Sequence, residues 1–158
     1  MVVRLATLAD LSAIVHLATA LWPEDARWHR GHFRALLAGK PASTLPLVVF
    51  VAEMKEAAVG FIEVGLRSHA EGCDGRRAAG FIEGWYVTPQ ARRRGVGRAL
   101  VRAGEAWAVS VGATEMGSDT WSWNRASQRA HEALGYAVAD RLIAFYKRLR
   151  PRKPRARG

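Results

Sequence analysis

Arg92-Arg93-Arg94-Gly95-Val96-Gly97 is the stretch of this sequence that decides the fold. An apolar segment at 79–88, rich in aromatic and β-branched residues, leads into it and predicts a strand that Pro89 ends. After it, apolar residues recur at helical spacing from Val96 to Val111, and Gly112 then ends the predicted helix. The sequence therefore predicts a strand, a basic glycine turn and an amphipathic helix in direct succession.

This turn has the chemistry of an anion-binding site. The start of a helix has unpaired backbone N–H groups and a partial positive charge, and together these bind phosphate oxygens. Gly95 and Gly97 let the backbone approach a pyrophosphate, while Arg92, Arg93 and Arg94 add positive charge. We expect a compact anionic ligand here. The alternative is a basic loop that merely precedes an ordinary helix.

The rest of the chain alternates in the same way. We expect one α/β (α+β) domain with a mixed, mostly antiparallel sheet and about four helices. The predicted strands cover 2–6, 47–54, 58–66, 79–88 and 114–118, with two final strands within 136–149, and the predicted helices cover 11–22, 25–37, 96–111 and 124–134. A turn near 55–56 joins the second and third strands, and Thr7 with Asp10 is a candidate capping pair.

Composition limits the class of protein. The chain has 158 residues, a net charge of +10 and nearly half apolar residues, which suits one domain at 1–150 with a basic, flexible tail at 151–158. Cys73 is the single cysteine, so an intrachain disulfide and a thiolate metal cluster are excluded. We expect a cytoplasmic protein with no metal and no membrane segment. A charge run is usually solvated, so no specific nucleic acid is expected either.

Two motifs resemble the GCN5-related N-acetyltransferase (GNAT) superfamily. Arg92-Arg93-Arg94-Gly95-Val96-Gly97 resembles its acyl-CoA pyrophosphate motif, and Asn124, Ala126-Ser127 and Ala133-Leu134-Gly135-Tyr136 resemble its second cofactor motif. The order of predicted elements is similar to that fold over the chain before the tail. The resemblance implies the GNAT fold and acetyl-CoA as the cosubstrate.

Further segments resemble one branch, the aminoglycoside 6'-N-acetyltransferases. They are Leu21-Trp22-Pro23, Phe81-Ile82-Glu83-Gly84-Trp85-Tyr86-Val87, Gly117-Ser118-Asp119-Thr120 and Ala130-His131-Glu132-Ala133-Leu134-Gly135. The resemblance implies that Trp22, Glu83 and Asp119 contact the acceptor. It also implies CoA contacts from Trp85, Tyr86, Val87, Arg92, Arg93, Arg94, Gly95, Val96, Gly97 and Asn124. Relatives often have a tyrosine before the Glu-Gly strand, where this chain reads Ser68-His69-Ala70-Glu71.

The acidic residues suit a cationic amine acceptor, which must lose a proton before it can attack. A carboxylate near the thioester carbonyl attracts the ammonium and can take that proton, so Glu83 or Asp119 is the expected base. Gly84 is expected to mark a bulge that separates this strand from its neighbour. The alternatives are that Glu83 pairs with an arginine and that Asp119 only caps a turn.

Two further candidates, His131 and Trp22, each have two possible roles. His131 either protonates the departing CoA thiolate or packs beside the cofactor. Trp22 either stacks on a sugar ring or closes the core at the end of the first helix. Trp121 and Trp123 are candidates for the wall of the acceptor pocket, whereas Cys73 is expected to be inert.

Three functions are compatible with these patterns. The first, acetyl transfer by direct attack to the 6'-amino group of aminoglycosides, confers antibiotic resistance, and we expect a homodimer. The second is acetylation of another amine, such as a polyamine or a protein N-terminus. The third is a non-catalytic module whose tail docks on nucleic acid or ribosomes. The acidic residues on the acceptor side favour the first.

Overall fold

The fold is a single sheet with helices on both faces. The computed structural model describes residues 1–23 and 26–149, so the predicted basic tail at 151–158 lies outside the described residues. Within these residues, five strands form one sheet in chain order. The strands are β1 (Val2–Leu5), β2 (Leu47–Met54), β3 (Ala57–Arg67), β4 (Ala79–Val87) and β5 (Met116–Ser118). Neighbouring strands are antiparallel except β4 and β5, so the predicted mixed, mostly antiparallel sheet is confirmed.

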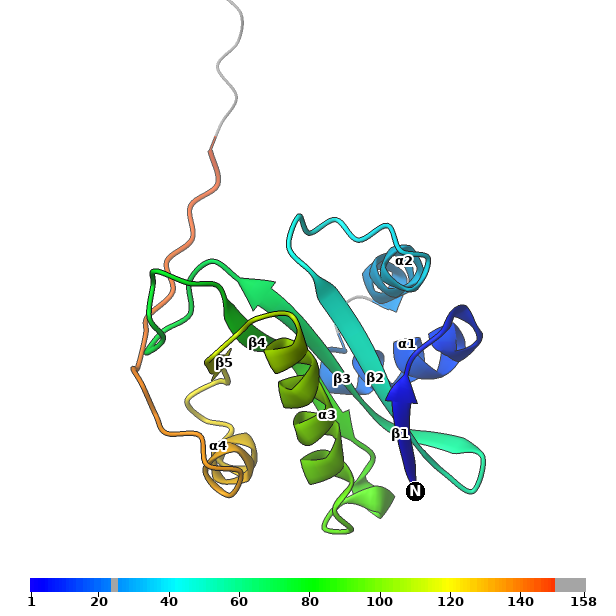
Figure 1. The fold of residues 1–158 in the computed structure, drawn as a ribbon. Helices are drawn as coiled ribbons and strands as arrows, with labels where there is room; N and C mark the ends of the chain where they lie inside the picture. Colours follow the sequence, from blue (N-terminus) through cyan, green and yellow to red (C-terminus); the bar gives the residue numbers. More distant parts are fainter. Residues whose placement is uncertain (24–25, 150–158) are drawn as a thin grey trace, which may run out of the picture.

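Helices cover both faces of the sheet (Figure 1). They are α1 (Leu11–Leu21), α2 (Ala26–Leu37), α3 (Val96–Ser110) and α4 (Arg125–Glu132), with short 3-10 turns at Leu8–Asp10 and Pro89–Ala91. Figure 1 shows α3 on one face of the sheet and α1 with α2 on the other. All four helices were predicted, and α1 ends just before Pro23 as expected.

A separate hydrophobic cluster forms on each face. One cluster joins α1 and α2 to side chains such as Phe61 of β3, and the other joins α3 to side chains such as Ile62. Successive residues of a strand point to opposite faces, so a strand covered on both sides is apolar almost throughout. Glu63 is a buried charged residue of β3 among these apolar neighbours, whereas Arg67 lies at the partly exposed end of the strand.

The turn between β2 and β3 holds the two strands in register. Lys55 and Glu56 both have positive φ values, 50° and 62°. Two successive left-handed residues are the geometry of a two-residue hairpin, whose twist matches that of the flanking strands. The predicted turn is confirmed.

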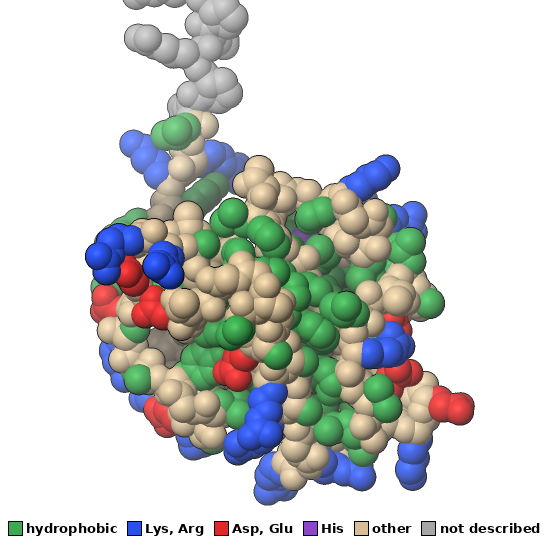
Figure 2. Space-filling model, viewed as in Figure 1, with side chains coloured by type: hydrophobic (Ala, Val, Ile, Leu, Met, Phe, Trp, Pro, Cys, Tyr) green, Lys and Arg blue, Asp and Glu red, His purple; other side chains and the backbone are tan. Residues whose placement is uncertain are grey.

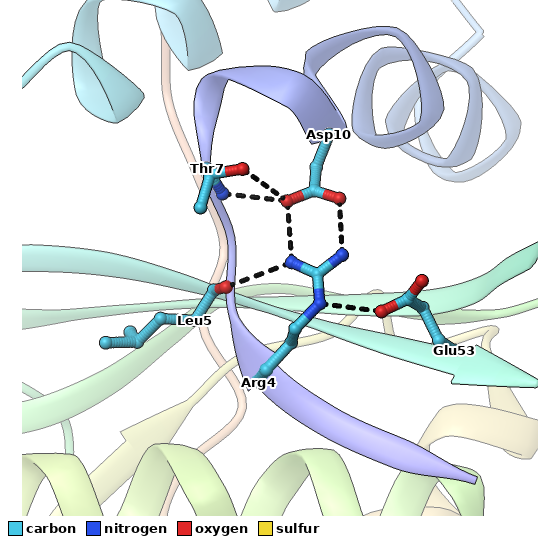
Figure 3. A network of polar contacts seen from close by, with 5 residues as sticks. All are labelled: Arg4, Leu5, Thr7, Asp10 and Glu53. Carbon is cyan, nitrogen blue, oxygen red and sulfur yellow. Dashed lines mark hydrogen bonds and ion pairs between the residues drawn. The ribbon is translucent and has the colours of Figure 1, made fainter. Parts of the chain in front are cut away.

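Arg4 fastens β1 to the start of α1 (Figure 3). Its guanidinium donates to both carboxylate oxygens of Asp10 at 2.8 Å and to Glu53 of β2 at 2.6 Å. The Asp10 carboxylate also accepts the backbone N–H of Thr7 at 2.8 Å, as the predicted capping pair requires. These bonds, with that to Arg4 the largest contribution, lower the pKa of Asp10 to about 2, and the carboxylate is therefore ionised at neutral pH.

The prediction of two final strands within 136–149 is wrong. In the described C-terminal segment, residues 137–149 form neither strand nor helix, and Figure 1 shows them leaving the domain beyond α4. Large apolar side chains are exposed there: Leu142, Ile143, Phe145 and Tyr146 are 68%, 79%, 93% and 83% exposed. A strand needs a neighbour to bond its amide and carbonyl groups, and among the residues that the structure describes this segment has none. The apolar pattern of the sequence does not show whether a neighbouring strand is present.

No helix of the described residues combines the length and apolar character needed to cross a membrane.

Candidate functional site

Strand β4 has a β-bulge at Glu83. Glu63 of β3 pairs with Gly84, but the next residue, Val64, pairs with Ile82, so Glu83 is left out of the ladder. A bulge bends its strand and redirects the side chain at that point. The expected bulge is therefore present, beside the glycine that predicted it.

Beyond the bulge, one edge of β4 is open. Strand β5 pairs with β4 only from Gly80 to Ile82. Within the described residues, no strand continues this pairing alongside Trp85, Tyr86 and Val87. The backbone groups on this edge can therefore bind an extended ligand in the manner of an added strand.

The turn before α3 has the geometry that the predicted anion site requires. Gly95 is the N-cap of α3 with φ at 81°, a left-handed conformation that glycine adopts without strain. In the described chain no side chain caps the first amides of α3, and a Cβ on Gly95 would meet open space. These amides can therefore bind an anion that approaches from outside.

Basic side chains surround this turn. Arg92, Arg93 and Arg94 are all exposed. Figure 2 shows Lys and Arg side chains gathered at the lower end of the molecule, where Figure 1 places the start of α3. Arg92 is also tied to the end of β4, because its Nε donates to the carbonyl of Val87 at 3.0 Å. The turn therefore joins the open edge of β4 to the start of α3.

Gly97 and Val96 have packing roles in addition to the CoA contacts expected of them. A Cβ on Gly97 would lie 2.8 Å from Cζ2 of Trp85, so the glycine makes room for the indole. The side chain of Val96 is buried in the core. Any ligand contact of Val96 must therefore come from its backbone N–H.

An acidic, aromatic pocket lies on the α1–α2 side of the bulge. It has a volume of about 520 Å³, and its lining includes Trp22, Trp28, His29, His32, Glu63 and Glu83. Trp22 lies directly against Gly84, where a Cβ would clash with the indole ring. Trp22 thus both packs against the core cluster and lines the pocket, so the two interpretations of this residue are compatible.

Glu83, which lines this pocket, pairs with an arginine beside it. Arg67 donates through Nε to Oε1 of Glu83 at 2.9 Å and through Nη2 to Oε2 at 2.5 Å. The guanidinium also lies 3.5 Å from the centre of the Phe81 ring. The hydrogen bonds to Glu83 raise the pKa of Arg67, and the charge of Asp119 adds to this effect. The arginine partner considered from the sequence is therefore present.

Asp119 lies immediately after β5, the strand that pairs with β4. Its side chain is exposed, and it acts on Arg67 through charge. The two predicted acids therefore lie around one guanidinium, with Glu83 in the pocket and Asp119 at the surface.

A second carboxylate of the pocket is bonded to a histidine. Nε2 of His32 lies 2.6 Å from Oε1 of Glu63, and the Glu63 side chain is only 6% exposed. Trp28 stacks on the His32 ring, with ring centres 4.8 Å apart and an interplanar angle of 5°. The hydrogen bond to Glu63 raises the pKa of His32 above 6.5.

His131 is held at both ring nitrogens. Nδ1 lies 2.8 Å from the carbonyl of Ser127, and Nε2 lies 2.9 Å from Oγ of Ser118. A carbonyl can only accept, so Nδ1 carries a proton, and in the neutral ring Nε2 accepts from the hydroxyl. The ring also packs edge-to-face against Trp85 and Tyr136. This arrangement favours the packing role over the proton donor.

The remaining candidates have local explanations. Oδ1 of Asn124 accepts the N–H of Ser127 at 3.1 Å and so caps α4. Trp121 and Trp123 are 68% and 72% exposed and do not line the acidic pocket. Burial raises the pKa of the Cys73 thiol, which agrees with an inert cysteine.

Sequence reasoning missed polar residues of the pocket, among them His32 and Glu63, and it did not identify Arg67, which bonds to Glu83. One signal was available, because Phe61-Ile62-Glu63 on β3 repeats the Phe81-Ile82-Glu83 pattern of β4. A single carboxylate within an apolar strand points to a buried partner. The spacing of residues along the chain, however, does not identify His32 as the partner of Glu63 or Arg67 as the partner of Glu83.

Comparisons with known proteins agree with this geometry. The Acetyltransferase (GNAT) family matches residues 11–136. An aminoglycoside N(6')-acetyltransferase type 1 from Klebsiella aerogenes is 40% identical over 148 residues, which cover 93% of this chain and 96% of the relative. The crystal structure of the 6'-N-acetyltransferase AAC(6')-IG from Acinetobacter haemolyticus has a TM-score of 0.84 and 28% identity, covering 95% of this chain and 100% of that one.

A further solved structure, AAC(6')-Iy in complex with the bisubstrate analogue CoA-S-monomethyl-acetylneamine, has a TM-score of 0.84 and 31% identity, covering 94% of this chain and 98% of that one. The open edge of β4, the basic turn before α3 and the bulge thus lie in a chain whose likeness to these enzymes extends over nearly its full length. The chain belongs to the acetyltransferase (GNAT) family, and within it to the aminoglycoside N(6')-acetyltransferases.

Proposed function

We propose that this enzyme transfers the acetyl group of acetyl-CoA to the 6'-amino group of aminoglycoside antibiotics and so confers resistance to them. The observation that carries the proposal is the position of the acidic pocket, which meets the open edge of β4 at the bulge of Glu83. The aminoglycoside N(6')-acetyltransferases among its relatives support the same acceptor.

Acetyl-CoA fits the other side of the site. The uncapped amides of α3 and the guanidinium groups of Arg92, Arg93 and Arg94 suit its pyrophosphate. The edge formed by Trp85, Tyr86 and Val87 suits the amides of the pantetheine arm, and one backbone N–H there can polarise the thioester carbonyl. The bisubstrate analogue bound to AAC(6')-Iy contains CoA, which supports this cosubstrate.

The acceptor pocket suits a sugar that carries ammonium groups. Trp22 and Trp28 offer flat aromatic surfaces, and Glu83 and Asp119 attract positive charge. In the reaction, the nitrogen of the neutral 6'-amine attacks the thioester carbonyl carbon. A C–N bond forms, the C–S bond breaks, and the departing CoA thiolate takes up the proton that the acylated nitrogen loses, which gives the amide and free CoA thiol.

Incubation of the purified protein with kanamycin and acetyl-CoA should release CoA thiol, measured with a colorimetric thiol reagent. Mass spectrometry of the product should show one added acetyl group on the ring that carries the 6'-amine. Turnover of a polyamine or a peptide, with none for any 2-deoxystreptamine antibiotic, would contradict the acceptor and favour the second function considered from the sequence.

We also propose that the enzyme is a cytoplasmic homodimer. Phe145 and Tyr146 belong to an extended segment whose apolar side chains are exposed, and such surfaces mark protein contacts. A second copy of the chain can cover the segment and provide the neighbouring strand that it lacks. Sedimentation equilibrium should give twice the mass of the chain, and Phe145→Glu should give the mass of one chain. A wild-type protein that sediments as a monomer at micromolar concentration would exclude the dimer.

A further inference from the structure

We infer that His32, oriented by Glu63, is the group that takes the proton from the acceptor ammonium. This inference rests on the proposed function, because it concerns the base for that reaction. The sequence pointed instead to Glu83 or Asp119.

The pair has the geometry of a base and its positioning residue. His32 comes from α2 and Glu63 from β3, and Nε2 of the ring lies 2.6 Å from the carboxylate. Trp28 stacks on one face of the ring, and Phe33 packs edge-to-face against it. A ring held in this way by a buried carboxylate has a fixed orientation and a fixed protonated nitrogen.

The second ring nitrogen is available to a ligand. Among the described residues, Nδ1 of His32 has no hydrogen-bond partner, and the His32 side chain is 21% exposed in a pocket that it lines. When Glu63 accepts the N–H at Nε2, Nδ1 of the neutral ring has a lone pair. This nitrogen can accept a proton from an ammonium in the pocket.

The pair also lies next to the expected position of the thioester. Glu63 is the cross-strand partner of Gly84, which follows the bulge and precedes the open edge at Trp85. His32 bonds to this same carboxylate. An amine that enters the pocket and reaches toward the edge of β4 therefore passes beside the histidine.

The other candidates for the base are already engaged or lie elsewhere. Both oxygens of Glu83 accept hydrogen bonds from Arg67, and Asp119 is exposed outside the pocket. Nε2 of His29 lies 2.9 Å from the carbonyl of Trp22, and its Nδ1 is buried. In the described part of the chain, His32 is thus the pocket histidine with an accessible nitrogen.

The charges around His32 set its proton affinity. Glu63 on β3 faces the ring directly, Glu83 on β4 acts at longer range, and Arg67 neutralises part of the Glu83 charge. The hydrogen bond to Glu63 is the largest influence, and the pKa of His32 lies above 6.5 as a result. The base is active when neutral, so kcat/KM should rise with pH through that pKa.

In the transfer, the N–H bond of the ammonium breaks and its proton binds Nδ1 of His32. The freed lone pair of the amine then attacks the thioester carbon, the C–S bond breaks, and the CoA thiolate takes up the second proton, which the acylated nitrogen loses. The imidazolium keeps its Nε2–H bond to Glu63, and it later loses the added proton to water. General-base catalysis of this kind contributes about 10²- to 10⁴-fold to a rate.

His32→Gln should lower kcat/KM for kanamycin about 100-fold at pH 8 and leave acetyl-CoA binding unchanged. In the pH profile of kcat/KM, the fall at low pH that comes from protonation of His32 should disappear. Only the fall that comes from protonation of the substrate amine should remain. The matched control is His16→Gln, which removes an exposed histidine from α1 and should leave the profile of the wild type.

Glu63→Gln tests the positioning residue. The neutral amide no longer stabilises the imidazolium, so the pKa of His32 should fall, and the acidic limb of kcat/KM should shift to lower pH. Proton-detected NMR titration of the ring in the unliganded enzyme should show the same fall. If Glu63 had only a structural role, Glu63→Gln would lower activity but would leave the midpoints of the kcat/KM pH profile and of the NMR titration unchanged.

The outcomes separate this inference from the proposed function. A wild-type protein that acetylates no aminoglycoside overturns both. An active wild type whose His32→Gln variant keeps the rate and pH profile overturns only the assignment of the base. Loss of the acidic limb in His32→Gln, with its shift in Glu63→Gln, supports the assignment.

Discussion

Gly95→Val should weaken acetyl-CoA binding about 100-fold, because it removes one or two charge-assisted hydrogen bonds to the pyrophosphate. Valine at a φ of 81° is strained, so the turn must shift and take the first amides of α3 with it. The new side chain would also fill the open space at Gly95 that a phosphate needs. Isothermal titration calorimetry with acetyl-CoA measures the change.

Gly112→Val is the matched control at the other end of the same helix. Gly112 also has a positive φ, 94°, and a Cβ there would also meet open space. The two variants should lose similar amounts of stability in urea unfolding, but only Gly95→Val should lose affinity. Equal acetyl-CoA affinity in the two variants would show that the pyrophosphate binds elsewhere.

Glu83→Gln should lower kcat/KM for kanamycin by roughly 100- to 1000-fold and leave acetyl-CoA affinity unchanged. The amide cannot pair with Arg67 as an ion, so an unneutralised guanidinium remains beside the pocket where a cationic acceptor must bind. A fall of 100- to 1000-fold in kcat/KM corresponds to about 3 to 4 kcal/mol of lost transition-state stabilisation, since each tenfold change is worth about 1.4 kcal/mol. Steady-state kinetics with both substrates varied would separate the two effects.

Two further variants test the cause of that loss. Asp74→Asn removes the carboxylate of another arginine pair, Arg76 with Asp74, which is exposed at the surface, and it should leave kinetics unchanged. Arg67→Gln in the Glu83→Gln background should restore part of the lost kanamycin affinity, because it removes the unpaired charge. If the double variant is no better than Glu83→Gln alone, Arg67 does not compete with the acceptor.

The sequence predicted the elements of the fold well where the signal is local. The hairpin at Lys55 and Glu56, the end of α1 before Pro23 and the glycine turn before α3 all depend on neighbouring residues, and all are present. The two final strands failed because a strand depends on a partner. The apolar pattern of residues 137–149 contains no information about whether its own chain supplies that partner.

The candidate site shows the same division between local and distant information. The bulge and the basic turn followed from glycines within short motifs. The bond between Arg67 and Glu83 was weighed only as an unnamed arginine, and that between His32 and Glu63 was not foreseen. Both pairs join residues far apart in the sequence, and their contact depends on how β3, β4 and α2 pack. Such pairs become visible only in three dimensions.

The homodimer that we propose would make the stability of this protein depend on its concentration, because the apolar segment at 137–149 is exposed in a single chain. Association stabilises a folded chain by mass action, so a protomer whose apolar surface is covered only by another copy gains stability as its concentration rises. Sparse chains would be degraded sooner than abundant ones. A cell that makes little of the enzyme would therefore lose activity out of proportion to the fall in synthesis.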